Sequence, residues 1–444
     1  EAVEREVATG EKVGVIAVRL YRPFDVAAFD RVLPDSARSI AVLDRTKEPG
    51  AVGEPLYTDV VSALVEARSD ALPRIVGGRY GLSSKEFTPA MVLTVLDELS
   101  QPQPRNHFTI GIVDDVTHTS LEHDESRWSE PDDVVRAVFY GLGSDGTVGA
   151  NKNSVKIIAE RTEQFAQGYF VYDSKKSGAM TVSHLRFGPE QIRSAYRIQD
   201  ADFVACHQAG FLDKLDVLEV ARPGATVLLN TSHTAETVWD SLPAEVQGQL
   251  IDKGLELWIV DGSRVAREAG LGGRINTVLQ TCFFHLAGVL PQDEATIAIK
   301  EAIEKSYKKR GQAVLDRNFD AVDGAIAALV RVELPTEVTS QHRMSPMVPD
   351  EAPDFVQRVT ATMMRRQGDL LPVSALPVDG TFPVATAQWE KRSIADEIPI
   401  WDPEICIDCA RCALVCPHAA IRMKVLAPDA FDGAPDSFQH KEWS

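Results

Sequence analysis

The sequence predicts a multi-domain α/β protein built around parallel sheets. Its 444 residues are enough for about two to four domains. Apolar, β-branched runs recur along the chain, and stretches of helical periodicity separate them, an alternation that is typical of parallel sheets. Hydrophobic residues make up 44% of the chain and charged residues 25%, the balance of an ordinary globular protein with a substantial core.

Two α/β regions are expected to follow one another. The first spans residues 1–115, with strands at 13–20, 40–43, 75–81 and 108–113 and helices at 58–67 and 88–99. The second spans residues 131–334, with strands at 134–140, 169–172, 203–206, 226–229 and 255–260. Thr88 and Pro89 suit the N-cap and the first position of their helix.

The remaining sequence differs in composition. Residues 335–400 hold many Pro, Met and polar residues with weak periodicity, which favours an extended linker over a packed domain. Residues 401–444 carry a run of cysteines.

The charge and the hydropathy exclude some partners. The formal net charge is -19, which argues against nucleic acid and anionic membranes as general partners. No apolar run approaches the roughly 20 residues needed to span a bilayer. The first residues lack the pattern of a secretory signal and the starting Met, so we interpret the chain as beginning inside a domain.

Four of the six cysteines form the run Cys406, Cys409, Cys412 and Cys416, followed by Pro417. This is the C-x2-C-x2-C-x3-C-P spacing of bacterial [4Fe–4S] ferredoxins, in which the fourth cysteine ligates the other cluster of a pair. A zinc site or reduced core thiols are the alternatives, but zinc sites favour two separated cysteine pairs. The clustering also indicates a reducing compartment, here the cytoplasm.

A second such run is absent from residues 417–444. We therefore expect the segment 401–444 to be a truncated ferredoxin-type domain. Cys206 and Cys282 are isolated in apolar surroundings and are interpreted as inert core residues.

A glycine-rich turn is the second candidate site. Gly141, Gly143 and Gly146 match G-x-G-x-x-G after an expected strand and before an expected helix. Such a turn brings backbone N–H groups close to a pyrophosphate at a helix N-terminus. Asp145 does not help to bind an anion unless its side chain caps the helix. The candidate ligand-binding residues here are Gly143, Ser144, Asp145, Gly146, Thr147 and Asn151.

A second cluster follows the strand expected at 169–172. Asp173 lies at the distance of a ribose-binding carboxylate, which favours a dinucleotide. Lys175, Lys176 and Ser177 suit a phosphate on the ribose better than a bare diol. Coenzyme A has both a pyrophosphate and a ribose phosphate, as does NADP. The alternative is a structural glycine turn beside a solvated lysine pair.

Three other features are weaker. The sequence from Gly272 to Arg274 could bind an anion or precede a helix cap. His184 and His207 lie near strand ends and could line a pocket, but they are interpreted as satisfied core or surface histidines.

Several segments together resemble pyruvate:ferredoxin (flavodoxin) oxidoreductase, a family of large 2-oxoacid oxidoreductases. In order they are VRLYRPF at 18–24, AVLDRTKEPGA at 41–51, GRYGLSSKEFTPAMV at 78–92, FYGLGSDGTVGANKNSVKII at 139–158, YDSKKSG at 172–178, TVSHLRFGP at 181–189, GLGGRINT at 270–277 and the cysteine run. The resemblance covers nearly the whole chain.

The resemblance implies four domains. Residues 1–115 are a transketolase C-terminal-like domain truncated at its N-terminus, and 131–334 are a gamma domain that binds coenzyme A. Residues 335–400 are a linking domain, and 401–444 begin a two-cluster ferredoxin-type domain. Thiamine diphosphate and Mg²⁺ lie in other domains of the whole enzyme, so this segment alone is expected to bind neither and to be inactive.

The reaction implied is the oxidative decarboxylation of pyruvate with coenzyme A to acetyl-CoA and CO₂, with ferredoxin or flavodoxin as electron acceptor and a homodimer as the whole enzyme. No acid–base residue of this chain is expected to carry the chemistry. Two other hypotheses are an NAD(P)-binding Rossmann protein with a ferredoxin tail, and an electron-transfer subunit of a split 2-oxoacid oxidoreductase.

Overall fold

The computed structural model describes residues 1–68, 70–143, 145–172, 180–390, 398–417, 419–435 and 437–442. The chain divides into two compact units, Glu1–Arg392 and Ser393–Ser444. Of the helices in the described ranges, none has both the length and the hydropathy to cross a lipid bilayer.

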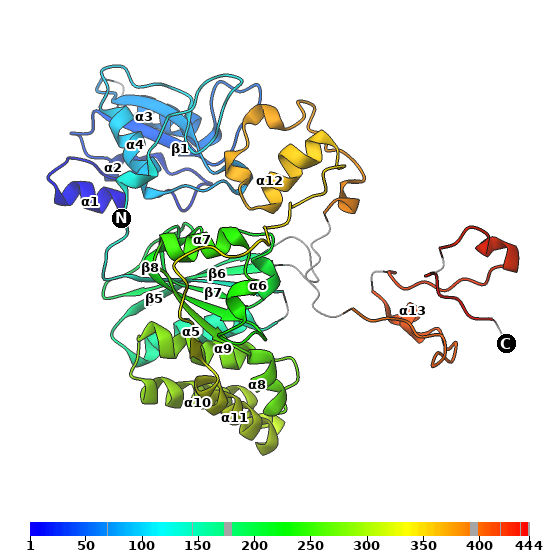
Figure 1. Ribbon diagram of the computed structural model, residues 1–444. Coiled ribbons are helices and arrows are strands. Elements are labelled where there is room, and N and C mark those ends of the chain that lie inside the picture. The colour runs from blue at the N-terminus through cyan, green and yellow to red at the C-terminus, as the bar shows by residue number, and fades with distance from the viewer. Residues whose placement is uncertain are drawn as a thin grey trace. The chain divides into compact units, whose positions relative to one another are not determined.

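The first α/β region of unit Glu1–Arg392 holds a small parallel sheet. Within its described residues the strands are β1 Ser39–Asp44, β2 Arg74–Arg79 and β3 Phe108–Thr109, in the order β1-β2-β3. The helices are α1 Ala2–Ala8, α2 Val26–Val32, α3 Pro55–Ala67 and α4 Pro89–Leu99 (Figure 1). Thr88 is the N-cap of α4 as expected, and its side chain accepts a hydrogen bond from the N–H of Met91.

The strand expected at 13–20 is wrong. Residues 11–20 form neither strand nor helix, and the side chains of Val15 and Leu20 are exposed. A β-branched composition indicates only that a segment suits a half-buried sheet, and no neighbouring strand pairs with this one among the described residues.

The second α/β region holds a larger, mixed sheet. Its described strands follow the order β10-β9-β8-β7-β4-β6-β5. Their bounds are β4 Val135–Leu142, β5 Phe165–Tyr172, β6 Met180–Gly188, β7 Ala201–Cys206, β8 Ala221–Asn230, β9 Glu256–Val260 and β10 Val330–Arg331. Strands β4, β7, β8 and β9 run parallel, as expected, whereas β6 is antiparallel to β4 and β5, and β10 to β9.

Strand β6 was not expected from the sequence. All nine of its residues are buried, so it lacks the period-two alternation that marks a half-exposed strand. Its insertion between β4 and β5 separates two strands that are consecutive along the chain.

Helices cover both faces of this sheet (Figure 1). One face packs on α5 Thr147–Arg161 and α9 Asn276–Ala287, and α10 Gln292–Tyr307 and α11 Gln312–Ala327 pack against these helices. At its centre the ring of Phe283 lies 5.0 Å from that of Phe139 and 5.3 Å from that of Phe203. On the opposite face, Val246 and Leu250 of α7 Ala244–Asp252 line an apolar cluster with Cys206 and Leu257.

The remaining described helices are short. Two more α-helices of the second region are α6 Val238–Ser241 and α8 Gly262–Glu268. Short 3-10 helices occupy Leu82–Ser84, Glu125–Arg127, Ala209–Phe211, Lys308–Arg310, Gly368–Leu370, Val373–Ala375, Thr386–Gln388 and Pro428–Phe431.

Part of the stretch expected as an extended linker is packed. A π-helix at Val356–Thr360 continues into α12 Ala361–Met364. Met347, Val348, Ala352, Val356 and Ala361 are buried together, with Leu215, Met364 and Trp389 against them. The sequence did not reveal this core, because its members are scattered without helical or strand periodicity.

Charged side chains tie this stretch to both α/β regions. The Lys85 ammonium donates to the carbonyl oxygens of Gly368, Asp369 and Leu371 at 3.3, 2.8 and 3.4 Å. The Arg197 guanidinium pairs with the carboxylates of Glu86 and Asp369. Three segments far apart in sequence therefore meet through two cationic side chains.

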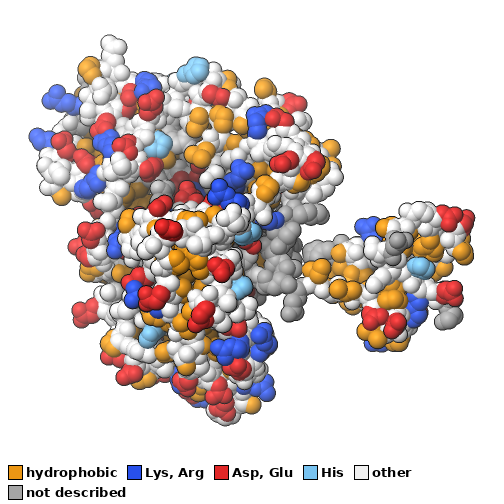
Figure 2. Space-filling model, in the orientation of Figure 1, with side chains coloured by type: hydrophobic (Ala, Val, Ile, Leu, Met, Phe, Trp, Pro, Cys, Tyr) orange, Lys and Arg blue, Asp and Glu red, His pale blue; other side chains and the backbone are white. Residues whose placement is uncertain are grey.

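The unit Ser393–Ser444 has little regular structure. Its helices in the described residues are α13 Arg411–Val415 and the 3-10 turn at 428–431. No described residue from 398 to 442 is buried. Apolar side chains are exposed here (Figure 2), among them Ile405, Ile407, Leu414 and Val415.

A buried ion pair stabilises the larger sheet. The Arg186 side chain on β6 is fully buried, and its Nε and Nη2 donate to the two carboxylate oxygens of Glu130 at 2.7 and 2.8 Å. Its Nη1 donates to the carbonyl of Tyr196 at 3.0 Å. This two-point pairing satisfies a charge that would otherwise be costly to bury.

We expect Glu130→Ala to lower the free energy of unfolding by about 3–5 kcal/mol, because Arg186 would stay buried without its counter-charge. Urea denaturation followed by circular dichroism measures the change. As a control, Asp323→Ala removes a surface pair with Lys300 and should cost less than about 1 kcal/mol. Equal stability of the two variants would contradict the assignment.

Candidate functional site

The glycine turn lies between β4 and α5. Gly141 is part of β4, and Gly146 has a φ of 91°, in the left-handed region that favours glycine. A Cβ on Gly141 would lie 2.5 Å from Thr147 Oγ1, and one on Gly146 would lie 3.0 Å from Cγ of Asn276. The two glycines therefore let the turn close tightly on itself and on the start of α9.

The Asp145 carboxylate fills the inside of this turn. Its Oδ2 accepts from the N–H of Leu142 at 2.8 Å and from the Thr147 hydroxyl at 2.7 Å. Its Oδ1 accepts from the N–H of Thr147, the first residue of α5, at 2.7 Å. From the position before the N-cap Gly146, the side chain thus bonds to the first N–H group of α5.

The carboxyl ends of the parallel strands meet beside the turn. The Thr147 hydroxyl lies 2.7 Å from Nδ1 of His207, which follows β7. The carbonyl of His207 accepts from Nδ2 of Asn230 at the end of β8, and Oδ1 of Asn230 accepts from the N–H of Gly262 at the start of α8. One hydrogen-bonded chain therefore joins the ends of β4, β7 and β8.

This edge is where a ligand is expected in such a sheet. Helix α5 leaves β4 on the face that holds Phe139, whereas α7, between β8 and β9, packs on the opposite face. Connections that leave to opposite faces open a crevice at the carboxyl ends of the strands between them.

The structure brings most of the predicted turn residues together. Gly143, Asp145, Gly146 and Thr147 lie in the turn and at the helix start, and Asn151 follows one turn later along α5. Asn151 is buried, and its Nδ2 has no hydrogen-bond partner among the described residues. Ser144, Asp173, Lys175, Lys176 and Ser177 lie outside the described residues.

From the sequence, His207 was at most a pocket-lining residue and was not linked to the glycine turn. The signal available was its position directly after an expected strand, which also suits any core histidine. Its contact with Thr147 depends on β7 lying beside β4, which the sequence does not indicate. Asn230 was missed because its contact depends on β8 lying beside β7.

Both buried histidines are held neutral. Burial lowers the pKa of His207 to about 4, against a smaller raising effect of Asp145. Burial also lowers the pKa of His184 on β6 to about 3, with the Arg366, Arg186 and Arg197 charges acting in the same direction. The Nδ1 of His184 accepts from the N–H of Ile198 at 3.2 Å.

The predicted cluster ligands lie in the C-terminal unit. Cys406, Cys409, Cys412 and Cys416 form no disulfide bonds, and the N–H of Ala420 donates to Sγ of Cys416 at 3.3 Å. Among the described residues no three Cys, His, Asp or Glu side chains gather in the geometry of a metal site. The structure therefore does not bring the four thiols together.

The residues nevertheless fit an iron–sulfur cluster. Asp408 and Ala410 adopt left-handed backbone conformations that turn the chain sharply between successive cysteines. The unit has four thiols but no buried apolar residue among those described, and a metal centre can supply the folding energy that such a small segment lacks.

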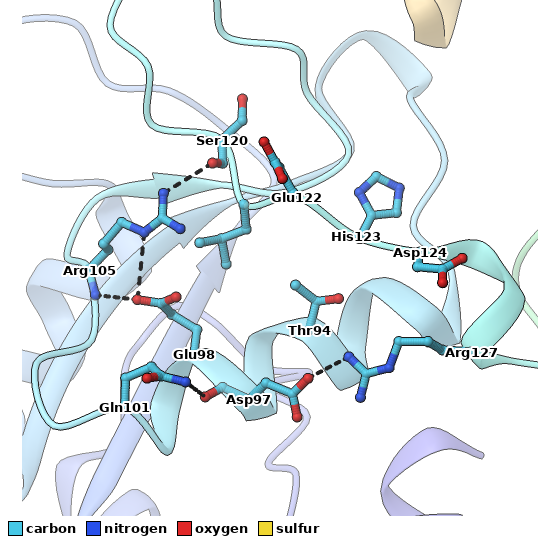
Figure 3. Close-up of a pocket in the computed structure, with 11 residues that line it drawn as sticks. Thr94, Asp97, Glu98, Gln101, Arg105, Ser120, Glu122, His123, Asp124 and Arg127 are labelled. Carbon is cyan, nitrogen blue, oxygen red and sulfur yellow. Dashed lines mark hydrogen bonds and ion pairs between the residues drawn. The ribbon is translucent and has the colours of Figure 1, made fainter.

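A separate cavity of about 520 Å³ lies beside α4 (Figure 3). Asp97 pairs with Arg127, and Arg105 pairs with Glu98 and donates to the carbonyl of Ser120. Its acidic and basic side chains largely pair with one another, and none of the predicted site residues lines it.

Comparison with known proteins assigns the parts of the chain. Residues 136–328 match the family described as pyruvate ferredoxin/flavodoxin oxidoreductase, and residues 1–88 match pyruvate:ferredoxin oxidoreductase core domain II. Residues 398–421 match a 4Fe-4S binding domain, and residues 341–395 match a domain of unknown function. The matches include the glycine turn and the cysteine run.

Three curated relatives illustrate the similarity. A pyruvate-flavodoxin oxidoreductase of Nostoc is 56% identical over 99% of this chain and 38% of its own length. That of Rhodospirillum rubrum is 56% identical over 98% of this chain and 37% of its own length. The pyruvate:ferredoxin oxidoreductase of Moorella thermoacetica is 50% identical over 100% of this chain and 38% of its own length.

The solved pyruvate oxidoreductase subunit of Thermotoga maritima is 19% identical, with a TM-score of 0.36, over 46% of this chain and 100% of that one. The chain spans a little over a third of the length of the curated relatives. The chain belongs to the pyruvate ferredoxin/flavodoxin oxidoreductase family.

The buried histidines predict a pH dependence of stability. The unfolded chain binds protons on histidine near pH 6.5, whereas the folded pKa values are about 4 and about 3. The stability that this difference contributes is fully present above pH 6.5 and is lost as the pH falls, toward 4 for His207 and toward 3 for His184. For His207 the loss amounts to about 3 kcal/mol.

Urea denaturation at several pH values measures this loss. The variant His207→Asn should lose less stability than the wild type between pH 6.5 and 4, because its side chain does not titrate there. His233→Asn, which replaces an exposed histidine, is the control and should follow the wild type. A His207→Asn profile parallel to the wild type would contradict the prediction.

Proposed function

We propose that this chain contributes the coenzyme A-binding and cluster-bearing parts of a pyruvate:ferredoxin or pyruvate:flavodoxin oxidoreductase. The observation that carries the proposal is an identity of 50–56% to such enzymes over 98–100% of this chain. Pyruvate and coenzyme A react to acetyl-CoA and CO₂, and the two electrons released pass to an oxidised ferredoxin or flavodoxin.

Coenzyme A binds at the glycine turn in this proposal. Asp145 already uses the N–H groups of Leu142 and Thr147. Helix geometry leaves the N–H groups of Val148 and Gly149 without intrahelical acceptors, at the positive end of α5. These amides and Asn151 bind the pyrophosphate. The ribose phosphate is bound by Lys175, Lys176 and Ser177.

The electron path uses the C-terminal unit. Cys406, Cys409 and Cys412 ligate one [4Fe–4S] cluster, and Cys416 ligates the neighbouring one, as the spacing rule for this motif requires. A bound cluster would carry one electron at a time. The two electrons released by oxidative decarboxylation would therefore leave in two steps. The chain itself supplies thiolates and backbone N–H groups around the cluster.

The remaining partners follow from the same family membership. Thiamine diphosphate and Mg²⁺ act in parts of the enzyme outside this chain, and the whole enzyme is a homodimer. Reduced thiols and clusters of this kind suit the cytoplasm.

The lysine pair tests where coenzyme A binds. The double variant Lys175→Ala with Lys176→Ala should lower the affinity for coenzyme A roughly 5- to 150-fold, which is the contribution expected of a charge-assisted contact. Dephospho-CoA should be affected much less, because it lacks the ribose phosphate. Isothermal titration calorimetry at two salt concentrations measures both, since screening should reduce the difference at high salt.

The control for this test is the exposed pair Lys308→Ala with Lys309→Ala, which has the same charge change and should bind like the wild type. Tight NADPH binding without coenzyme A binding would support the dehydrogenase hypothesis instead. Binding of neither ligand would leave a purely structural glycine turn.

The cysteine run is tested in the native protein purified without oxygen. Pyruvate with coenzyme A should reduce its clusters and bleach their visible absorption. Cys409→Ser should lower bound iron by about four atoms per chain, one cluster, and slow flavodoxin or ferredoxin reduction. Cys282→Ala, which alters a buried cysteine of α9, should keep the iron. Full iron in Cys409→Ser would refute the assignment.

A further inference from the structure

His207 is buried beside the glycine turn but has no part in the proposed reaction. Its backbone N–H donates to the carbonyl of Tyr140 at 2.9 Å, and its carbonyl accepts from Asn230 at 3.0 Å. Its ring meets that of Phe139 edge-on at 6.2 Å. Contacts to β4 and β8 therefore hold this residue in place from both sides.

Counting donors assigns the direction of the hydrogen bonds. Asp145 accepts from two backbone N–H groups and from the Thr147 hydroxyl. The single proton of that hydroxyl is thereby used, so Thr147 Oγ1 must accept from His207 at 2.7 Å. The His207 proton is then on Nδ1, and Nε2 is an acceptor without a partner among the described residues.

The direction of the His207–Thr147 hydrogen bond matters because it fixes the hydroxyl that holds the Asp145 carboxylate. While both its oxygens face the turn, the carboxylate occupies N–H groups and does not face a ligand. Without the Thr147 hydroxyl held by His207, the carboxylate would lose one of its three donors and could turn out of the glycine turn, which would place a negative charge beside the phosphates. Among the described residues, the hydrogen bonds of the Thr147 hydroxyl go to Asp145 and His207.

We propose that His207 is a positioning residue for coenzyme A binding: through the Thr147 hydroxyl it keeps the Asp145 carboxylate folded into the glycine turn and away from the ligand phosphates. This inference rests on the proposed function, in which coenzyme A binds at this turn. His207 itself touches neither the ligand nor the reacting atoms.

Two pairs of variants of the native protein test the chain of bonds. Thr147→Val removes the hydroxyl at nearly constant shape, and Thr147→Ser keeps it. His207→Leu removes the donor, and His207→Asn keeps an N–H near the position of Nδ1. We expect Thr147→Val and His207→Leu each to raise the Kd for coenzyme A roughly 10-fold, and the conservative partners to stay within roughly 3-fold of wild type.

Two further readouts separate positioning from mere support of the fold. The Kd ratio between Thr147→Val and wild type should fall as salt is raised, because salt screens the repulsion from a freed carboxylate. Adding Asp145→Asn to Thr147→Val should recover part of the affinity, whereas a structural role alone would make the double variant no better. Circular dichroism shows whether each variant is folded. If Thr147→Val does not fold, the variants His207→Leu and His207→Asn provide the test.

The outcomes distinguish the positioning role of His207 from coenzyme A binding at this turn. If wild-type protein binds no coenzyme A, the proposed function fails at this turn. If wild type binds it and Thr147→Val and His207→Leu bind equally well, the positioning role is refuted while the function stands. A salt-independent loss that Asp145→Asn does not relieve would also refute the positioning role.

Discussion

The placement of the Asp145 carboxylate is the constraint on which the candidate site depends. An acidic side chain beside a predicted phosphate site is unfavourable unless local donors neutralise it. Here three donors do so, two N–H groups and the Thr147 hydroxyl. The close approach needs Gly141, since any Cβ there would collide with Thr147 and Asp145. Gly141 thus makes room for the carboxylate inside the turn.

The larger sheet explains how this arrangement stays in place. Strand β7 lies beside β4 and brings His207 to Thr147, while β8 brings Asn230 to the carbonyl of His207. The cost of burying an imidazole is met by keeping it neutral, as the lowered pKa of His207 reflects. Polar groups at the sheet edge are therefore joined to one another, while the aromatic core around Phe283 lies on one face of the same strands.

The two units of the chain rely on different sources of stability. In Glu1–Arg392 two sheets and the cluster around Val356 bury apolar side chains, and Lys85 and Arg197 join segments distant in sequence. In Ser393–Ser444 the described residues bury no side chain, and the cysteines stand on sharply turned backbone. A segment of this kind gains order from ligands that bind its thiols rather than from a hydrophobic core.

The sequence by itself determined the features that depend on neighbouring residues. Local periodicity and turn chemistry predicted β4, the Gly146 turn, the start of α5, the Thr88 cap and the cysteine spacing, because each depends on residues a few positions apart. Tertiary structure decided the rest. Strand β6 is buried along its whole length and so shows no alternation, and residues 11–20 have strand-like composition without a partner. The bond from His207 to Thr147 joins residues 60 positions apart, and only the packing of β7 against β4 brings them into contact.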